Sequence, residues 1–210
     1  MGRSLGPLRT GFRYGVVAVA IALLADLRFL YVDPIGTPDW ILTVFENYRT
    51  TLALAAFLFL GILAAIRVRP DRTEEGVPYR SLLLRDCTLA ATVVATLAAA
   101  TLFLLTALNA TVFADDIRDY ARDAAPSMVA YYEKVAGRMD EPPPLPTLEQ
   151  VETSLQPPAL RDLGRSIFNF VLRALLLGFA GALVGLLRGS SGRNPQPDAL
   201  PSKGTRDPGA

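Results

Sequence analysis

The feature that most constrains this chain is a run of 28 residues, Cys87 to Ala114, without a single formal charge. Three further stretches, residues 14–32, 50–66 and 166–187, are nearly as apolar. A transmembrane helix needs about 20 predominantly apolar residues to cross the hydrocarbon core of a bilayer. The pattern therefore predicts an all-α integral membrane protein, a four-helix bundle with helices over approximately 13–32, 48–67, 84–112 and 166–188.

The composition excludes several classes of function. The chain has no histidine and one cysteine, Cys87, which rules out histidine-dependent catalysis, histidine-ligated metals and thiolate clusters. A net charge of +1 gives no electrostatic basis for binding nucleic acid. We therefore expect no catalytic residue, no cofactor and no metal site, and we predict that the protein is not an enzyme.

The first apolar stretch follows Arg3, Arg9 and Arg13. A positive N-terminus ahead of a short apolar run is also typical of a signal peptide. Because Leu23 and Leu24 stand where a cleavage site needs small residues, we expect a retained first helix. Cleavage would leave three helices.

The segment between the third and fourth predicted helices is the only extramembrane part large enough for structure of its own. Apolar residues recur at helical spacing from Ile117 to Met139, which predicts an amphipathic helix broken or kinked at Pro126. A proline-rich spacer follows, and Thr147 with Gln150 fits a capping box that begins a second short helix. We expect residues 114–164 to form a helical cap, which belongs with the bundle to one domain over residues 1–188. The Gly-, Ser- and Pro-rich residues 189–210 should be a disordered tail.

The distribution of Lys and Arg predicts the orientation. Twelve lie in the N-terminus, the second connection and the tail, against seven in the first and third connections. The third connection also carries ten acidic residues. The positive-inside rule then places both termini in the cytoplasm and the cap outside. In a bacterial cell this corresponds to the cytoplasmic (inner) membrane.

A group of carboxylates opens the cap. Asp116, Asp119 and Asp123 share one helix face, and the segment resembles the first aspartate-rich motif of the intramembrane prenyltransferases. That resemblance implies magnesium and diphosphate binding. The second motif of those enzymes is missing, however, and interleaved Arg118 and Arg122 favour local pairs with Asp115 and Asp119. A solvated, salt-bridged helix is the interpretation we prefer.

Two features of the predicted membrane segments indicate how they pack. Gly178, Gly181, Ala182 and Gly185 form small-xxx-small pairs, which allow close helix packing within the bundle or against another copy. Asp26 and Arg173 lie at matching depth in the first and fourth predicted helices. Because unpaired intramembrane charges are costly, we predict that these two helices are neighbours and that Asp26 pairs with Arg173 as a structural lock. Arg28 lies nearer the surface, where it can extend its charge to water.

The overall layout resembles an uncharacterised bacterial family of four-helix membrane proteins, a domain of unknown function. The shared features are an arginine-bearing turn before the third helix, Arg72-Thr-Glu-Glu-Gly-Val-Pro-Tyr-Arg80, a charged helical insert and a Gly-rich last helix. The resemblance implies a fold and a location in the membrane, and it implies no activity.

Taken together, these patterns predict a non-enzymatic membrane protein that acts as an accessory or assembly subunit through its cap and helix faces. Its partners would be the lipid bilayer and a membrane protein partner or further copies of itself. One alternative is a small transporter or channel-like protein that acts as an oligomer. A remote alternative is an enzyme that handles a lipid or prenyl diphosphate.

Overall fold

The computed structural model describes residues 6–68, 78–159, 161 and 163–191. Within them the chain is entirely helical, as predicted. The order is α1 (Pro7–Asp26), a short 3-10 turn η1 (Arg28–Leu30), α2 (Asp39–Arg67), α3 (Tyr79–Thr111), α4 (Ala114–Ala136), α5 (Leu148–Leu155) and α6 (Leu163–Ser191).

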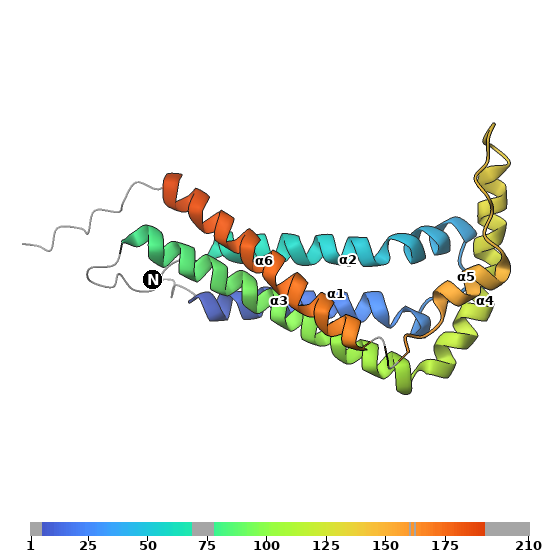
Figure 1. Ribbon diagram of the computed structural model, residues 1–210, viewed down its shortest axis with the longest axis horizontal. Helices are drawn as coiled ribbons and strands as arrows, with labels where there is room; N and C mark the ends of the chain where they lie inside the picture. Colours follow the sequence, from blue (N-terminus) through green and yellow to red (C-terminus); the bar gives the residue numbers. More distant parts are fainter. Residues whose placement is uncertain (1–5, 69–77, 160, 162, 192–210) are drawn as a thin grey trace, which may run out of the picture.

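Four helices, α1, α2, α3 and α6, run side by side along the long axis of the molecule (Figure 1). The central helix is α3, which contacts α6, α1 and α2, and α2 also contacts α1 and α6. The start of α1 and the end of α6 lie at the end of the molecule opposite α4 and α5 (Figure 1). Small buried residues such as Ala18, Ala90 and Ala98 let these helices approach closely.

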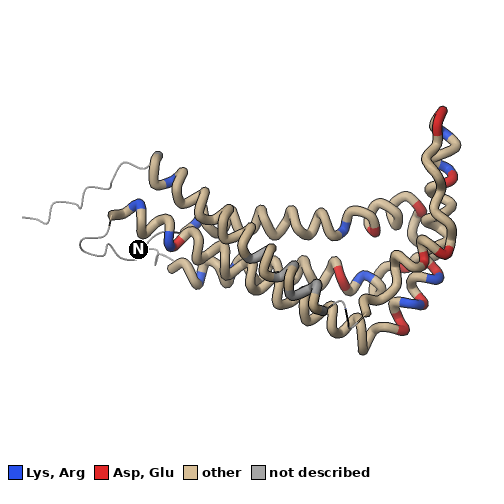
Figure 2. The backbone as a smooth tube through the Cα atoms, in the orientation of Figure 1, with Lys and Arg blue, Asp and Glu red and all other residues tan. Residues whose placement is uncertain are grey.

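Three of the described helices, α1, α2 and α3, are long and apolar enough to cross a membrane. Charged residues gather at the two ends of the helices and leave their middle portions largely uncharged (Figure 2). In α6 the apolar stretch is the shorter segment Leu175–Ser190. The side chains of much of its first half, Arg173 included, lie outside the described ones, so the fourth predicted span stays a prediction.

The predicted helix boundaries need several corrections. The first helix ends at Asp26 rather than at residue 32, because the chain tightens into η1. The second begins at Asp39 rather than at residue 48, so Glu46 lies on the same continuous helix as the apolar run that follows it. The last helix extends to Ser191, so residues 189–191 do not belong to a disordered tail, and the rest of the predicted tail lies outside the described residues.

The cap contains two helices that cross the end of the bundle, with α4 turned steeply away from the long axis (Figure 1). The predicted capping box is confirmed: the Thr147 hydroxyl accepts from the Gln150 backbone, and the Gln150 side chain accepts from the Thr147 backbone. Of the predicted break or kink at Pro126, the break is wrong, since α4 continues through this residue as one helix, and the kink stays a prediction. Pro126 and Arg122 lie on the exposed face, where water can satisfy the carbonyl that proline leaves without a donor.

An apolar cluster attaches the cap to the bundle. Its buried members come from the inner face of α4, from α5 and from the start of α2, and Phe29 and Val32 pack against it from the turn after α1. Leu42 of α2 lies at its centre and is fully buried. The cap is therefore packed onto η1 and the start of α2.

Candidate functional site

The strongest candidate for a functional site is a network of buried charges where the cap meets α1 and α2. At its centre is the carboxylate of Glu46, on the second turn of α2. Arg28 of η1 forms an ion pair through its Nε with Glu46 Oε1. The hydroxyl of Tyr120, on α4, donates a hydrogen bond of 2.8 Å to the same oxygen. Three segments of the chain thus meet at one carboxylate.

Two further charges extend the network. Arg49, one turn after Glu46 on α2, places its Nε 3.4 Å from Glu46 Oε2, near enough for ionic attraction though outside hydrogen-bond geometry. The Nη1 of Arg49 also lies 3.6 Å from Oδ1 of Asp26, at the end of α1. Two acids and two bases alternate along this chain of contacts, so the charges of these four described side chains balance.

The centre of the network is shielded from solvent. The side chain of Arg28 is 5% exposed and that of Glu46 is 2% exposed. The guanidinium carbon of Arg28 lies 5.4 Å from the centre of the Tyr120 ring, which is within the range of a cation–π contact. Removing one partner from a buried pair typically costs about 3–5 kcal/mol, because the other charge is left without compensation.

Burial raises the pKa of the Tyr120 phenol above its usual value of 10.0, and the nearby Glu46 carboxylate raises it further. Tyr120 therefore stays protonated at physiological pH and keeps its hydrogen bond to Glu46. A phenol held in this way is a structural donor, and it is a poor general base. The arrangement holds helices together rather than activating a nucleophile.

The local sequence explains how these groups meet. On a continuous helix Asp26 and Arg28 would point about 200° apart, because each residue turns the helix by about 100°. The helix ends at Asp26 and η1 redirects the chain, so Arg28 reaches Glu46 while Asp26 faces Arg49. Pro34 and Pro38 lie in the turn that leads into α2, and this turn brings the start of α2 beside the end of α1.

The sequence prediction for these charges needs one correction. Arg28 is buried rather than extended toward water, because Glu46 supplies its counter-charge. The described residues of α1 and α6 make no contact with each other, but the side chains of much of the first half of α6 lie outside the described ones, so the prediction that these helices are neighbours stays a prediction. Asp26 faces Arg49 in the structure. The side chain of Arg173 lies outside the described ones, so its pairing with Asp26 stays a prediction.

Sequence reasoning missed Glu46 and Tyr120. Tyr120 follows the apolar period of α4, which predicts a core side chain and gives no sign of its hydrogen bond to Glu46. Glu46 carried a usable signal, because an acid and a base three residues apart directly precede a long apolar run. In two consecutive antiparallel helices, the charges at the end of the first and the start of the second lie at the same depth.

The carboxylates predicted to share one face of the cap are exposed on the surface of α4, and they do not join the buried network. The local ion pairs are confirmed: Arg118 pairs with Asp115, and Arg122 Nη1 lies 3.2 Å from Asp119 Oδ1. Asp116 and Asp123 are exposed on the same helix. Among the described residues, no three acidic or cysteine side chains are arranged to hold a metal ion.

The glycines of the last helix lie against α3 of the same chain. A Cβ atom on Gly181 would lie 2.5 Å from the Cβ of Ala91, and one on Gly185 would lie 2.9 Å from the Cα of Leu84. These distances are shorter than van der Waals contact, so only glycine fits at these two positions, where the backbone of α6 lies close to α3. An open apolar groove between α3 and α6 is bordered by the two other residues of the predicted packing face, Gly178 and Ala182.

Comparison with protein families, with curated proteins and with solved structures found no match for this chain. The resemblance to the four-helix family is therefore one of layout. Inferences about function rest on the geometry of the molecule itself.

Proposed function

We propose that this protein is a non-enzymatic accessory or assembly subunit of a bacterial cytoplasmic membrane. In this proposal α1, α2, α3 and α6 cross the bilayer as a four-helix bundle, both termini lie in the cytoplasm and the cap lies on the outer face. The cap is the surface that a partner membrane protein recognises.

The observation that carries the proposal is the buried network around Glu46. In it Arg28 and Glu46 form a buried ion pair, Tyr120 of α4 donates a hydrogen bond to Glu46, and the partly exposed Arg49 and Asp26 link α2 to α1. A cap held by such contacts keeps one orientation relative to the membrane helices. A fixed, charged surface above a bilayer suits recognition of a partner, whereas a gate or a lid would need a weaker attachment.

The outer surface of α4 supports the same interpretation. Acidic and basic residues follow one another along α4 (Figure 2), and Asp116, Arg118 and Arg122 among them are exposed. Its ion pairs join neighbouring residues of the helix, and in each pair both side chains are more than half exposed. These side chains can therefore form ion pairs with a partner protein instead. Charge patterns of this kind determine the choice of partner and the rate of association more than affinity.

The test is affinity purification of the full chain from its native membrane in mild detergent, with a Glu46→Gln variant beside it. We expect one partner in stoichiometric amount with the wild type and its loss with Glu46→Gln at equal membrane levels. Glu133→Gln, the same change at an exposed site of α4, should retain the partner. A monomer without a partner would refute the proposal, and a discrete homo-oligomer would favour the transporter or channel alternative.

A further inference from the structure

A second feature of the cap lies apart from the buried network. An open cavity of about 670 Å³ separates the start of α2 from the C-terminal half of α4. Trp40 and Asp39 border it from α2, Tyr131 and Lys134 border it from α4, and Arg138 borders it from the turn after α4. It combines aromatic rings with two cations, which is a different chemistry from the apolar groove between α3 and α6.

The two cations converge on this cavity. Lys134 lies in the last turn of α4 and Arg138 in the turn that directly follows the helix, and both residues border the cavity. Both are exposed, and neither forms an ion pair with any described side chain. The one acidic residue of the lining, Asp39, stands in the first turn of α2, where the positive end of the helix dipole stabilises its charge. The lining therefore keeps a net positive charge.

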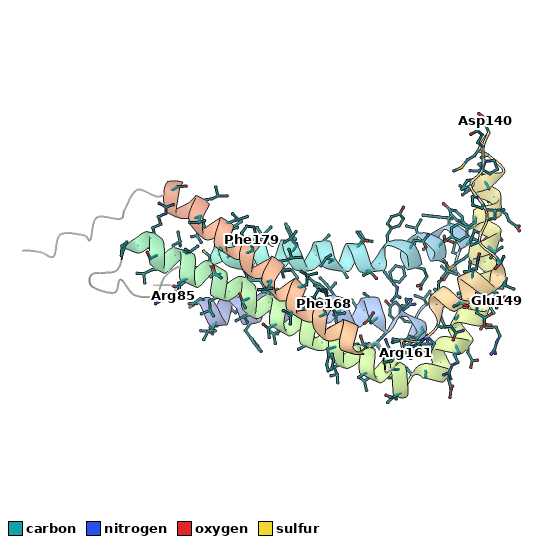
Figure 3. All side chains as sticks on the ribbon, viewed as in Figure 1. Arg85, Asp140, Glu149, Arg161, Phe168 and Phe179 are labelled. Atoms are coloured by element: carbon teal, nitrogen blue, oxygen red, sulfur yellow. The ribbon has the colours of Figure 1, made fainter. Side chains whose placement is uncertain are left out.

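The cavity lies at the level of lipid headgroups. With 29 residues, α2 is about 44 Å long, which matches the roughly 40–45 Å thickness of a bilayer including its headgroup regions. Trp40, one residue from its start, then lies among the headgroups, where tryptophan is enriched. The segment that follows α4, with Asp140 at its tip, projects sideways past α2 (Figure 3). The end of α4 thus overhangs the bilayer beside α2.

We propose that this cavity binds the phosphate of an anionic phospholipid headgroup in the leaflet next to the cap. The ammonium of Lys134 and the guanidinium of Arg138 would donate charge-assisted hydrogen bonds to phosphate oxygens. Trp40 and Tyr131 would pack against the glycerol region. The inference goes beyond the proposed function, since it requires membrane insertion but no protein partner.

Trp40 is the only tryptophan in the sequence, so it reports on this cavity directly. The full-length protein is reconstituted in vesicles of phosphatidylglycerol and phosphatidylcholine, in which one lipid at a time carries bromine near its headgroup. Quenching of Trp40 gives the relative affinity of the two lipids. We expect about a tenfold preference for phosphatidylglycerol, since each cation near an anionic surface strengthens binding several-fold.

The test variant is Lys134→Gln/Arg138→Gln, and it should lose the preference. Its matched control is Arg118→Gln/Arg122→Gln, which removes two arginines at the same spacing from the solvent-facing part of α4 and should keep the preference. Circular dichroism verifies that both are folded. If a variant does not fold, the comparison of the two lipids in the wild type still decides.

Two results would overturn the proposal. The first is equal quenching by the two lipids in the wild type, or an equal loss of preference in both double variants, which would indicate general surface charge. The second is a saturable change in Trp40 emission with inorganic phosphate, lost in Lys134→Gln/Arg138→Gln, without any lipid preference. That outcome would assign the cavity to free phosphate.

Discussion

Replacing Glu46 with Gln should destabilise the protein more than any other isosteric change at the junction of cap and helices. The carboxylate receives Arg28 and Tyr120 on one oxygen and faces Arg49 with the other. The variant leaves the buried guanidinium of Arg28 without its counter-charge, which should cost about 3–5 kcal/mol. Tyr120→Phe removes only the hydrogen bond and keeps the ring, so it should cost about 1.5–3 kcal/mol.

The assay is unfolding of the full-length protein in mixed micelles by increasing amounts of SDS, followed by circular dichroism. Glu133→Gln, at an exposed site, should stay within about 0.5 kcal/mol of the wild type. The decisive variant is Arg28→Met/Glu46→Gln, which leaves Asp26 with Arg49 as a neutral pair.

Because the double change removes both charges of the central pair, its cost should be smaller than the sum of the two single changes, by about 0.5–3 kcal/mol. Strict additivity would show that Arg28 and Glu46 do not act as a pair. A loss for Glu46→Gln no larger than that for Glu133→Gln would refute the assignment of the network as the attachment of the cap.

Three further predictions follow from the geometry. Gly181→Ala should lower the stability of the protein by about 1–3 kcal/mol, because the new methyl group would collide with α3. Gly178→Ala should lower it less, since a Cβ there would lie 3.2 Å from a threonine hydroxyl. Unfolding in SDS measures both variants. A cysteine introduced at Ser154, in a protein without the native cysteine, should react with an impermeant thiol reagent added outside the cell. A cysteine at Thr73, which lies beyond the described residues, should not react. The opposite pattern would place the cap in the cytoplasm. The raised pKa of Tyr120 makes the free energy of unfolding fall as pH rises above 10.0, since the unfolded phenol ionises before the folded one, and the slope should be shallower in Tyr120→Phe.

Local patterns were enough to predict most of the elements. The apolar runs placed the long helices, and Thr147 with Gln150 located the start of α5 because a capping box depends only on neighbours in sequence. The ion pairs of Arg118 and Arg122 were predictable for the same reason, since partners three residues apart share a helix face.

The buried network could not be derived in this way. Periodicity gives the face of a helix but not which helix lies opposite or at what depth. The depth assigned to Asp26 assumed a helix that ran to residue 32, and the actual end at Asp26 shifts every position after it. Arg28 and Glu46 meet because a 3-10 turn redirects the chain, and a pattern with a period of 3.6 residues carries no signal for that turn.

The network around Glu46 also bears on how the chain enters the membrane during synthesis. The four charges of Asp26, Arg28, Glu46 and Arg49 belong to α1, η1 and α2, which are synthesised before α3 and α4. A single charged residue at the centre of an inserting helix costs about 2.5–3.5 kcal/mol, and charges near the helix ends, as here, cost less. The first two helices can offset this cost between themselves and partition as one hairpin. Tyr120 then arrives at a carboxylate already in place, so docking of α4 is expected to be a late step of maturation.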